Sequence, residues 1–524
     1  MGQTLQPDLA RLEKSPRDLE RWQKAQRQLL AGSAAGALPV YRDLTQRFPG
    51  ILNLWFELGA AAAGDLDFAL ACHAYERARA LASADPAALV MIGQQFHRLR
   101  QIDRARACFQ QAVEADPSSV HARLSWAAWL ERERRLDQAA AQVDACLASR
   151  PNEPAALYYR AFLLHRAGRQ EEAERLLRNL AQGSLSDPNV KISCFHLLGV
   201  VLDNLGQYAE AMDWLHKAKA LVRQNNNVAA LEQAYDKADR QRRALLERLM
   251  PDMIQRWQHD VPAEQFRFKL ALLGGHPRSG TTLMEQILGA HPAVRAFDES
   301  EAFVAEVGDK LAPPPPATPL SAQALHALPA ARRDALRRRY FRSLFREVDG
   351  EPDAEVLLDK NPTPTASLHL WLRVFPESKI LIALRDPRDV VISCFFQNLT
   401  LTPLNVNFLS LDRTVKHYAD LMDTWLRLRE LGGFEWLETR YEDVVGGLEA
   451  EGRRVTQFLG LSWHADQASY NEAAPRKIVY SPTYGEVAKP VHDRAVGRWR
   501  NYATALEPFL PRLATYARAF GYES

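Results

Sequence analysis

The sequence is poor in cysteine, and the few cysteines that it has form no recognisable pattern. Five are scattered through 524 residues, an odd number with no C-x-x-C spacing. This arrangement excludes a disulfide framework and a cysteine-based zinc site, and it indicates small core residues in a reducing compartment. The five are Cys72, Cys108, Cys146, Cys194 and Cys394.

The sequence also lacks a large net charge and any long apolar run. Its 66 basic and 64 acidic residues leave a net charge of +2, which excludes nucleic acid or an acidic membrane as a bulk electrostatic partner. Any basic site therefore has to be local. The N-terminus has no apolar stretch typical of a signal peptide, and no segment offers about 18 consecutive apolar residues. We therefore expect a soluble, cytoplasmic protein without membrane contact.

The length of the chain predicts two or three domains. Residues 1–35 are charged and compatible with a helical lead-in. Residues 223–262 are polar with a helical pattern, so we interpret them as a connector. Between these segments, residues 36–222 are repetitive, and after them residues 263–524 alternate apolar strand-like runs with helical patterns.

The repetitive segment has a period of 34 residues. Four small residues recur at this spacing and a fifth follows after 38 positions; a larger apolar residue follows each of the five by four positions, and prolines separate the units. The pattern resembles the tetratricopeptide repeat and predicts an α-solenoid of paired helices. It leaves open whether the array is a packing scaffold that forms a homodimer or a groove that recruits a protein or peptide acceptor. The small residues are Ala71, Ala105, Ala139, Ala173 and Ala211.

The second half predicts an α/β domain like that of P-loop proteins. Expected strands are residues 266–273, 356–358, 379–384 and 434–439, with the first helix at residues 282–289. Strands separated by helices predict a parallel sheet whose ligand lies at the carboxyl ends of the strands. Two further segments are polar or stiff: prolines 313–316 predict a surface loop, and seven arginines within residues 332–346 predict a solvated helix face, with an acidic-acceptor patch as the alternative.

Three motifs fall at expected strand ends and carry the candidate chemistry. The first, H-P-R-S-G-T-T-L, has the spacing of a nucleoside-triphosphate loop, but Thr281 replaces the phosphate-binding lysine and the positive charge lies at Arg278. Such a loop before a helix N-terminus is an anion site. The other two, L-L-D-K-N-P and L-R-D-P-R-D-V-V-I-S, supply Lys360 and Arg385. Together they predict a ligand with several anionic groups.

These motifs together resemble sulfotransferases that use 3′-phosphoadenosine 5′-phosphosulfate (PAPS). The first resembles their 5′-phosphosulfate loop, and residues 385–393 resemble their 3′-phosphate motif. The order of loop arginine, A-H-P-x-V, acidic cluster and D-K-N-P is most similar to protein-tyrosine sulfotransferases and to bacterial repeat-fused sulfotransferases. The resemblance covers residues 266–505.

The resemblance implies a role for each matching residue. Glu299 would be the general base, with Asp298 and Glu301 as alternatives, while Lys360 and Arg278 would neutralise charge on the transferred group. No metal is implied. Ser481 would be a further hydroxyl at the transferred group. The implied nucleotide contacts are Arg278, Ser279, Gly280, Thr281, Thr282, Arg385, Ser393, Tyr441, Thr483, Lys489 and Arg498.

Two departures from the family pattern concern charge. Gln397 stands where an arginine is usual, and Glu301 stands where a basic acceptor contact is expected. The second puts an acidic tyrosine peptide in doubt, so the acceptor hydroxyl stays open between a tyrosine, a glycan and a small molecule. Two other functions also stay open: a P-loop kinase, in which Asp359 would bind magnesium, and a non-catalytic repeat scaffold.

Overall fold

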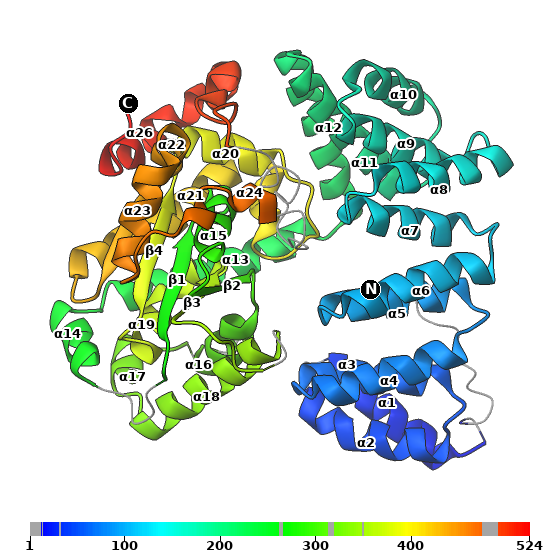
Figure 1. Ribbon diagram of the computed structural model, residues 1–524, viewed down its shortest axis with the longest axis horizontal. Helices are drawn as coiled ribbons and strands as arrows, with labels where there is room; N and C mark the ends of the chain where they lie inside the picture. The colour runs from blue at the N-terminus through cyan, green and yellow to red at the C-terminus, as the bar shows by residue number, and fades with distance from the viewer. Residues whose placement is uncertain are drawn as a thin grey trace. The chain divides into compact units, whose positions relative to one another are not determined.

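The computed structural model describes residues 12, 14–30, 33–260, 266–312, 319–347, 350–473 and 491–523, and the chain divides into two compact units (Figure 1). The first is Met1–Val190 and the second is Lys191–Ser524. The division falls inside the repetitive segment, so nearly all of the last helical pair belongs to the second unit. Within the described residues, no helix is long and apolar enough to cross a membrane.

The first unit consists of antiparallel helical pairs, as the 34-residue period predicts. Four of the repeated small residues lie on its helices and are fully buried, which lets paired helices approach closely. Its helices are α1 (Pro16–Leu30), α2 (Ala34–Arg47), α3 (Leu52–Gly64), α4 (Phe68–Leu81), α5 (Pro86–Arg98), α6 (Ile102–Ala115), α7 (Val120–Arg132), α8 (Leu136–Ser149), α9 (Pro154–Arg166) and α10 (Gln170–Gln182).

The turns inside four of the helical pairs, α3–α4, α5–α6, α7–α8 and α9–α10, repeat with the same period. Leu66, Arg100, Arg134 and Gly168 lie 34 positions apart, and all have positive φ angles between 58° and 80°. Only glycine adopts this left-handed conformation without a steric cost. The repeat therefore imposes the turn geometry even where the residue is leucine or arginine.

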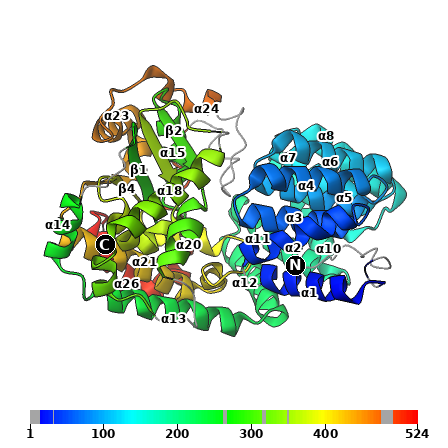
Figure 2. The ribbon, with the colours of Figure 1, turned by 90° about the horizontal axis from the view of Figure 1, so that it is seen from below.

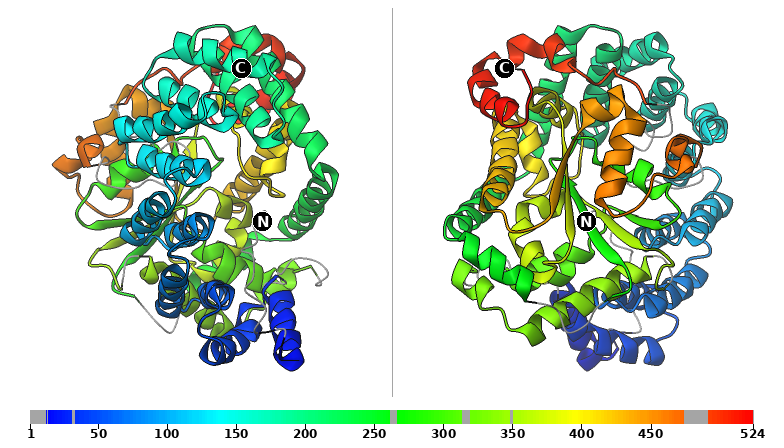
Figure 3. Two further views of the ribbon diagram at one scale, coloured as in Figure 1. Left: turned by 90° about the vertical axis from the view of Figure 1, so that its right-hand side faces the viewer. Right: turned by 60° about the vertical axis from the view of Figure 1, so that its left-hand side comes forward.

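The second unit contains a five-stranded parallel sheet in the order β2-β3-β1-β4-β5, whose strands are seen in the right-hand view of Figure 3. The strands are β1 (Lys269–Gly275), β2 (Val294–Asp298), β3 (Val356–Lys360), β4 (Lys379–Leu384) and β5 (Trp436–Arg440). The parallel sheet is confirmed, and four strands lie within three residues of their expected ends. Strand β2 was not expected, because this edge strand carries Arg295 and Asp298 and lacks a continuous apolar run.

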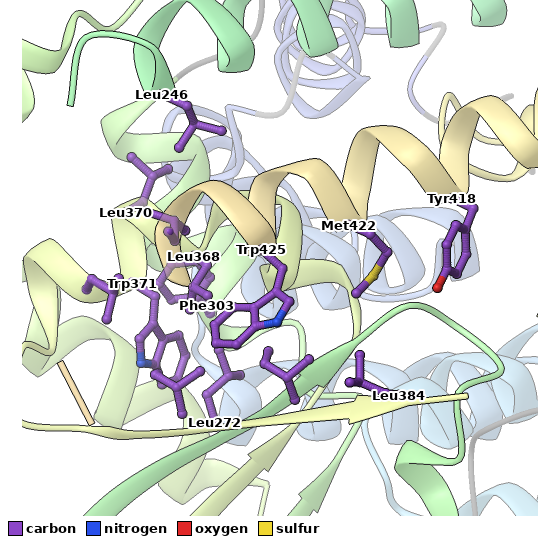
Figure 4. Packing of buried hydrophobic residues seen from close by; sticks show 14 of the residues in the cluster. Leu246, Leu272, Phe303, Leu368, Leu370, Trp371, Leu384, Tyr418, Met422 and Trp425 are labelled. Carbon is purple, nitrogen blue, oxygen red and sulfur yellow. The ribbon is translucent and has the colours of Figure 1, made fainter. Parts of the chain in front are cut away.

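Helices cover both faces of the sheet, since successive strand residues point to opposite sides. Leu273 of β1 packs with Met284 and Ile287 of α15, whereas Leu272 packs with Trp425 and Trp371 on the other face. Figure 4 shows this second cluster, in which Tyr418, Met422 and Trp425 extend from α21 toward the sheet. The main covering helices are α15 (Thr281–Gly289), α18 (Ala330–Arg346), α19 (Leu368–Val374), α20 (Pro387–Phe395), α21 (Leu411–Leu431), α22 (Tyr441–Gly446) and α23 (Leu448–Phe458).

The remaining helices of the second unit precede the sheet, follow β2, or end the chain. The connector forms α13 and α14, and Figure 2 shows α13 beside α21. These helices are α11 (Pro188–Asn204), α12 (Tyr208–Asn225), α13 (Val228–Leu246), α14 (Pro251–His259), α16 (Asp309–Leu311), α17 (Ala322–His326), α24 (Tyr470–Ala473), α25 (Ala503–Leu506) and α26 (Leu510–Ala519); a π-helical turn, Val304–Gly308, comes just before α16.

Helix α18 confirms only part of the expected solvated arginine face: Arg332, Arg338, Arg339 and Arg342 are exposed, but two of the seven arginines are buried. Arg333 and Arg337 are 1% and 3% exposed. Arg333 pairs with Asp260 at 2.7 Å, and Arg337 pairs with Glu377 at 2.7 Å. A buried arginine of this kind needs a carboxylate partner, and the partners lie on other elements, so the arginine run alone could not reveal them.

Candidate active site

The loop after β1 has three residues with positive φ angles. Gly275 has φ 125°, and a Cβ there would lie 2.3 Å from the Ala383 carbonyl oxygen. Gly280 has φ 89°, and its Cβ would lie 2.8 Å from a ring atom of Tyr441. Between them Arg278 adopts φ 74° although it has a side chain. Turns of this type direct successive backbone N–H groups into a concavity that binds anions, and non-glycine residues in this conformation concentrate at functional sites.

The first turn of α15 completes this concavity. Gly280 is the N-cap residue, and Thr281 and Thr282 are the first helical residues. Both threonines and Ser279 are buried. The free N–H groups of a helix N-terminus add partial positive charge at the same point. The loop residues predicted to hold an anion therefore lie together.

A cluster of cations and hydroxyl groups joins this loop to α20. Arg278 Nε donates a hydrogen bond to Ser393 Oγ at 3.1 Å, and Arg385 Nη1 donates to the Arg278 carbonyl oxygen at 3.4 Å. The Arg385 guanidinium lies 5.1 Å from the Tyr441 ring centroid. Arg278, Arg385, Ser393 and Tyr441, which are separated by up to 163 positions in the sequence, thus meet at one place.

The two arginines of this cluster lack close carboxylate partners. Among the described residues, no carboxylate lies within 4.0 Å of Arg278, and the ion pair of Arg385 with Asp389 is long, at 3.9 Å. Arg385 Nε is buried without a hydrogen-bond partner in the same set of residues. Burial lowers the pKa of Arg278, and the neighbouring cations Arg385 and Arg498 lower it further. Buried, clustered cations with so little compensation from carboxylates indicate an anionic ligand.

A second cluster lies at the ends of β2 and β3. Lys360 is fully buried, and its Nζ lies 3.3 Å from Glu299 Oε1 and also pairs with Asp298. Burial acts to lower the pKa of Lys360, but the carboxylates of Asp298 and Glu299 outweigh it, so the pKa is raised and the ammonium is charged. The Glu299 amide donates to the Lys360 carbonyl at 2.8 Å, which fixes the two residues together.

The three carboxylates that were candidates for the general base, Glu299, Asp298 and Glu301, differ in how exposed they are and in whether they contact Lys360. The Glu299 side chain is 38% exposed, whereas that of Asp298 is 11% exposed. Glu299 also has a positive φ of 51°, an unfavourable conformation for a residue with a side chain. Glu301 is exposed, and no ion pair joins it to Lys360 among the described residues. Glu299 is therefore the carboxylate that is both open to a substrate and coupled to Lys360.

Arg498 lies beside the loop cluster but is engaged elsewhere. Its guanidinium pairs with Asp203 of α11 at 2.7 Å and lies 4.3 Å from the Phe396 ring centroid. The predicted contacts Thr483 and Lys489, together with Ser481, lie outside the described residues. So do prolines 313–316.

Asp389, the second aspartate of R-D-P-R-D, has a structural role that was not predicted from the sequence. Its carboxylate accepts hydrogen bonds from the amides of Gly497 and Trp499, both at 2.7 Å, and so holds the backbone around Arg498 against α20. Asp386, by contrast, caps α20 through the Arg388 amide as expected. An N-cap can be predicted from neighbouring residues, whereas the contacts of Asp389 reach across more than one hundred positions.

Two buried histidines form hydrogen bonds at the loop after β1: His276 lies in the loop and His417 lies on α21. His276 Nδ1 lies 2.8 Å from the Pro277 carbonyl oxygen and therefore donates to it. His276 Nε2 is then an acceptor, and His417 Nδ1, at 2.8 Å, donates to it. Burial lowers the pKa of His276 to about 4 and that of His417 well below its usual value. Both rings are neutral at physiological pH.

Because these histidines stay neutral in the folded protein, we expect the second unit to lose stability in acid. Burial also lowers the pKa of His196 and of His369 to about 3. The unfolded chain binds protons at these histidines near pH 6.5 and the folded chain does not, so the free energy of unfolding falls as the pH drops from about 6.5 towards 4. Urea titrations at pH 7.5, 6 and 5 measure this loss, and His276→Asn should reduce it. A midpoint independent of pH over this range would contradict the assignment.

Comparison with known proteins agrees with this site. Residues 271–465 match the model of the sulfotransferase family, and residues 86–119 and 192–225 match the tetratricopeptide repeat. The chain is 29% identical over 246 residues to protein-tyrosine sulfotransferase 2 of Gallus gallus and 27% identical over 239 residues to protein-tyrosine sulfotransferase A of Caenorhabditis elegans. These matches cover 44% and 43% of this chain and 62% and 60% of the relatives, less than two thirds of their length.

Among solved structures, the sulfotransferase domain of a Synechococcus olefin synthase aligns with 50% of this chain and 98% of its own, at a TM-score of 0.33 and 18% identity. The family match contains the anion loop, the Glu299–Lys360 pair and α20, whereas the repeat matches lie in the helical pairs before them. The chain therefore combines segments that match the tetratricopeptide repeat with a segment, residues 271–465, that matches the sulfotransferase family.

Proposed function

We propose that this protein transfers a sulfuryl group from PAPS to the hydroxyl group of an acceptor. The observation that carries the proposal is the pair Arg278 and Arg385: Arg385 donates to the Arg278 carbonyl oxygen, Arg278 donates to Ser393, and neither arginine has a close carboxylate partner among the described residues. Two such cations beside a helix N-terminus suit a nucleotide with separate anionic groups at its 5′ and 3′ positions. The family match of residues 271–465 supports the same assignment.

The chain divides the chemistry between its two clusters. PAPS would supply the activated sulfuryl group, held by Arg278 and the amides of the loop. Glu299 would accept the proton of the acceptor hydroxyl, for which its exposed carboxylate is suited. Lys360 is charged and lies 3.3 Å from that carboxylate, so its ammonium would neutralise charge that develops on the leaving oxygen.

The acceptor that we propose is a protein or peptide tyrosine. The two named relatives are protein-tyrosine sulfotransferases, and the repeats offer a surface of the kind that binds proteins. A phenol has a pKa near 10, so a carboxylate can take its proton only as attack proceeds. We further propose that the reaction takes place in the cytoplasm, because the few scattered cysteines suit a reducing compartment.

The structure gives the kinase alternative little support. That alternative assigned a magnesium ion to Asp359, but this carboxylate is fully buried and accepts the Tyr340 hydroxyl at 2.9 Å. Tyr340 belongs to the cluster that packs against the opposite face of the sheet from α15. Asp359 therefore faces away from the side of the sheet that carries α15.

Two measurements test the proposed function. Calorimetry should detect binding of adenosine 3′,5′-bisphosphate to the purified protein, and labelled PAPS should transfer its label to one of a panel of tyrosine peptides, glycans and small phenols. Transfer to a glycan alone would overturn the tyrosine assignment and keep the sulfotransferase. Magnesium-dependent phosphoryl transfer without bisphosphate binding would overturn the proposal in favour of a kinase, and no nucleotide binding at all would favour a scaffold.

A further inference from the structure

The last helical pair, α11 and α12, shares a hydrophobic core with α20. Met212 and Leu215 of α12 lie in the same buried cluster as Phe395 and Phe396. His196 Nε2 of α11 also donates a hydrogen bond to the Phe396 carbonyl oxygen at 3.0 Å. Packing and hydrogen bonding therefore fix this repeat against the helix that carries Ser393.

A hydrogen-bonded path leads from this repeat to the anion loop. Lys219 of α12 is buried and donates to the Gln397 carbonyl oxygen, at the carboxyl end of α20 where carbonyl groups lack helical partners. Gln397 Nε2 donates to the Ser393 carbonyl oxygen at 3.0 Å, and Ser393 Oγ accepts from Arg278. These contacts connect Lys219 of the repeat to Arg278 of the anion loop through Gln397 and Ser393.

Asp203, near the end of α11, makes the second connection. Its Oδ2 accepts from Arg498 at 2.7 Å, and its Oδ1 accepts from the Tyr502 hydroxyl. Arg385 of the anion site donates to the carbonyl oxygen of Ala495, three positions before Arg498, and Asp389 of α20 accepts from the amides on either side of Arg498. Arg498 is also close enough to Arg278 to lower the pKa of that arginine. A carboxylate of the repeat thus holds a cation that contributes to the positive potential at the anion loop.

We propose that Asp203 is a positioning residue for nucleotide binding, so that the last tetratricopeptide repeat forms one wall of the site for the 3′-phosphate. The inference rests on the proposed function. Without Asp203, the long Arg498 side chain would sample several rotamers, and binding would have to order it again. Removing the carboxylate also removes some repulsion of phosphate, but that effect acts over a longer, partly solvated distance and is weaker than a direct contact.

Two nucleotides distinguish positioning from a general structural role. In Asp203→Asn, which keeps the side-chain volume and an acceptor for Tyr502, we expect the Kd for adenosine 3′,5′-bisphosphate to rise by about tenfold, as the loss of one charge-assisted hydrogen bond would give. The Kd for adenosine 5′-phosphate, which lacks the 3′ group, should change by less than about twofold. In steady-state transfer the KM for PAPS should rise while kcat stays near that of the wild type.

The matched control is Asp213→Asn, which removes an exposed carboxylate from α12 and should leave both Kd values unchanged. Equal losses of affinity for both nucleotides in Asp203→Asn, or no loss for either, would overturn the assignment of Asp203. If the wild-type protein binds neither nucleotide, the proposed function fails instead, so the two failures are distinguishable.

Discussion

Replacing Glu299 with glutamine is expected to lower the rate of sulfuryl transfer by about 10²- to 10⁴-fold, the contribution typical of a positioned general base. Glutamine keeps the size of the side chain but cannot accept the proton. Lys360 keeps its partner Asp298, so the buried ammonium remains compensated and the fold should persist. Single-turnover assays with labelled PAPS measure the loss, and calorimetry with adenosine 3′,5′-bisphosphate should give an affinity close to that of the wild type.

Two neighbouring carboxylates provide the controls for this experiment. Glu301→Gln removes an exposed carboxylate two positions away and should leave turnover within about threefold of the wild type. Asp298→Asn removes the stronger partner of Lys360 and should affect both stability and turnover, because the buried ammonium loses a counter-charge. Turnover by Glu299→Gln at the wild-type rate would exclude Glu299 as the base, and a selective loss in Glu301→Gln would assign that role to Glu301.

The sequence was sufficient to predict what depends on local periodicity. The 34-residue spacing predicted the helical pairs, and Ala105 and Ala139 are buried as that spacing requires. The apolar run of β4 predicted its bounds at residues 379 and 384. The motif at residues 385–393 predicted both the helix and its cap at Asp386. In each case the signal lies within a few positions of the element that it predicts.

The sequence could not predict pairings between distant residues. Arg498 was expected to contact phosphate, yet its partner Asp203 lies 295 positions away in a repeat. Arg333 was expected in solvent, yet Asp260 lies beside it. These pairs depend on how helices pack in three dimensions. Nothing in the sequence around either partner indicates which residue it pairs with. The division of the chain after Val190 is hidden for the same reason, because all the repeats look alike in sequence.

The strain at Arg278 and Glu299 is a link between the fold and the proposed chemistry. Both residues adopt positive φ angles, which cost about 1–2 kcal/mol for a residue with a side chain. Glycine would relieve this cost at either position, so local stability does not explain an arginine or a glutamate there. The side chains themselves explain it: one reaches Ser393 and the other reaches Lys360.

This strain makes Arg278 the position where catalysis and folding can be separated most clearly. Removing its guanidinium is expected to lower kcat/KM for PAPS by about 10²- to 10³-fold, the cost typical of losing one donor to a developing negative charge. Arg278→Gly removes the side chain and suits the positive φ, whereas Arg278→Ala removes it and keeps the steric cost. Both variants should lose activity to the same extent, although the glycine variant should be the more stable of the two.

Arg278→Lys completes the set, because it keeps the positive charge but replaces the planar guanidinium with a single ammonium that cannot donate to Ser393 and to the ligand in the same geometry. Its kcat/KM should lie between those of the wild type and the glycine variant. Thermal unfolding of all three variants, with and without adenosine 3′,5′-bisphosphate, separates the two effects. If Arg278→Gly retained wild-type kcat/KM while Arg278→Ala did not, backbone strain would account for the loss, and the guanidinium would have no part in holding the sulfuryl group.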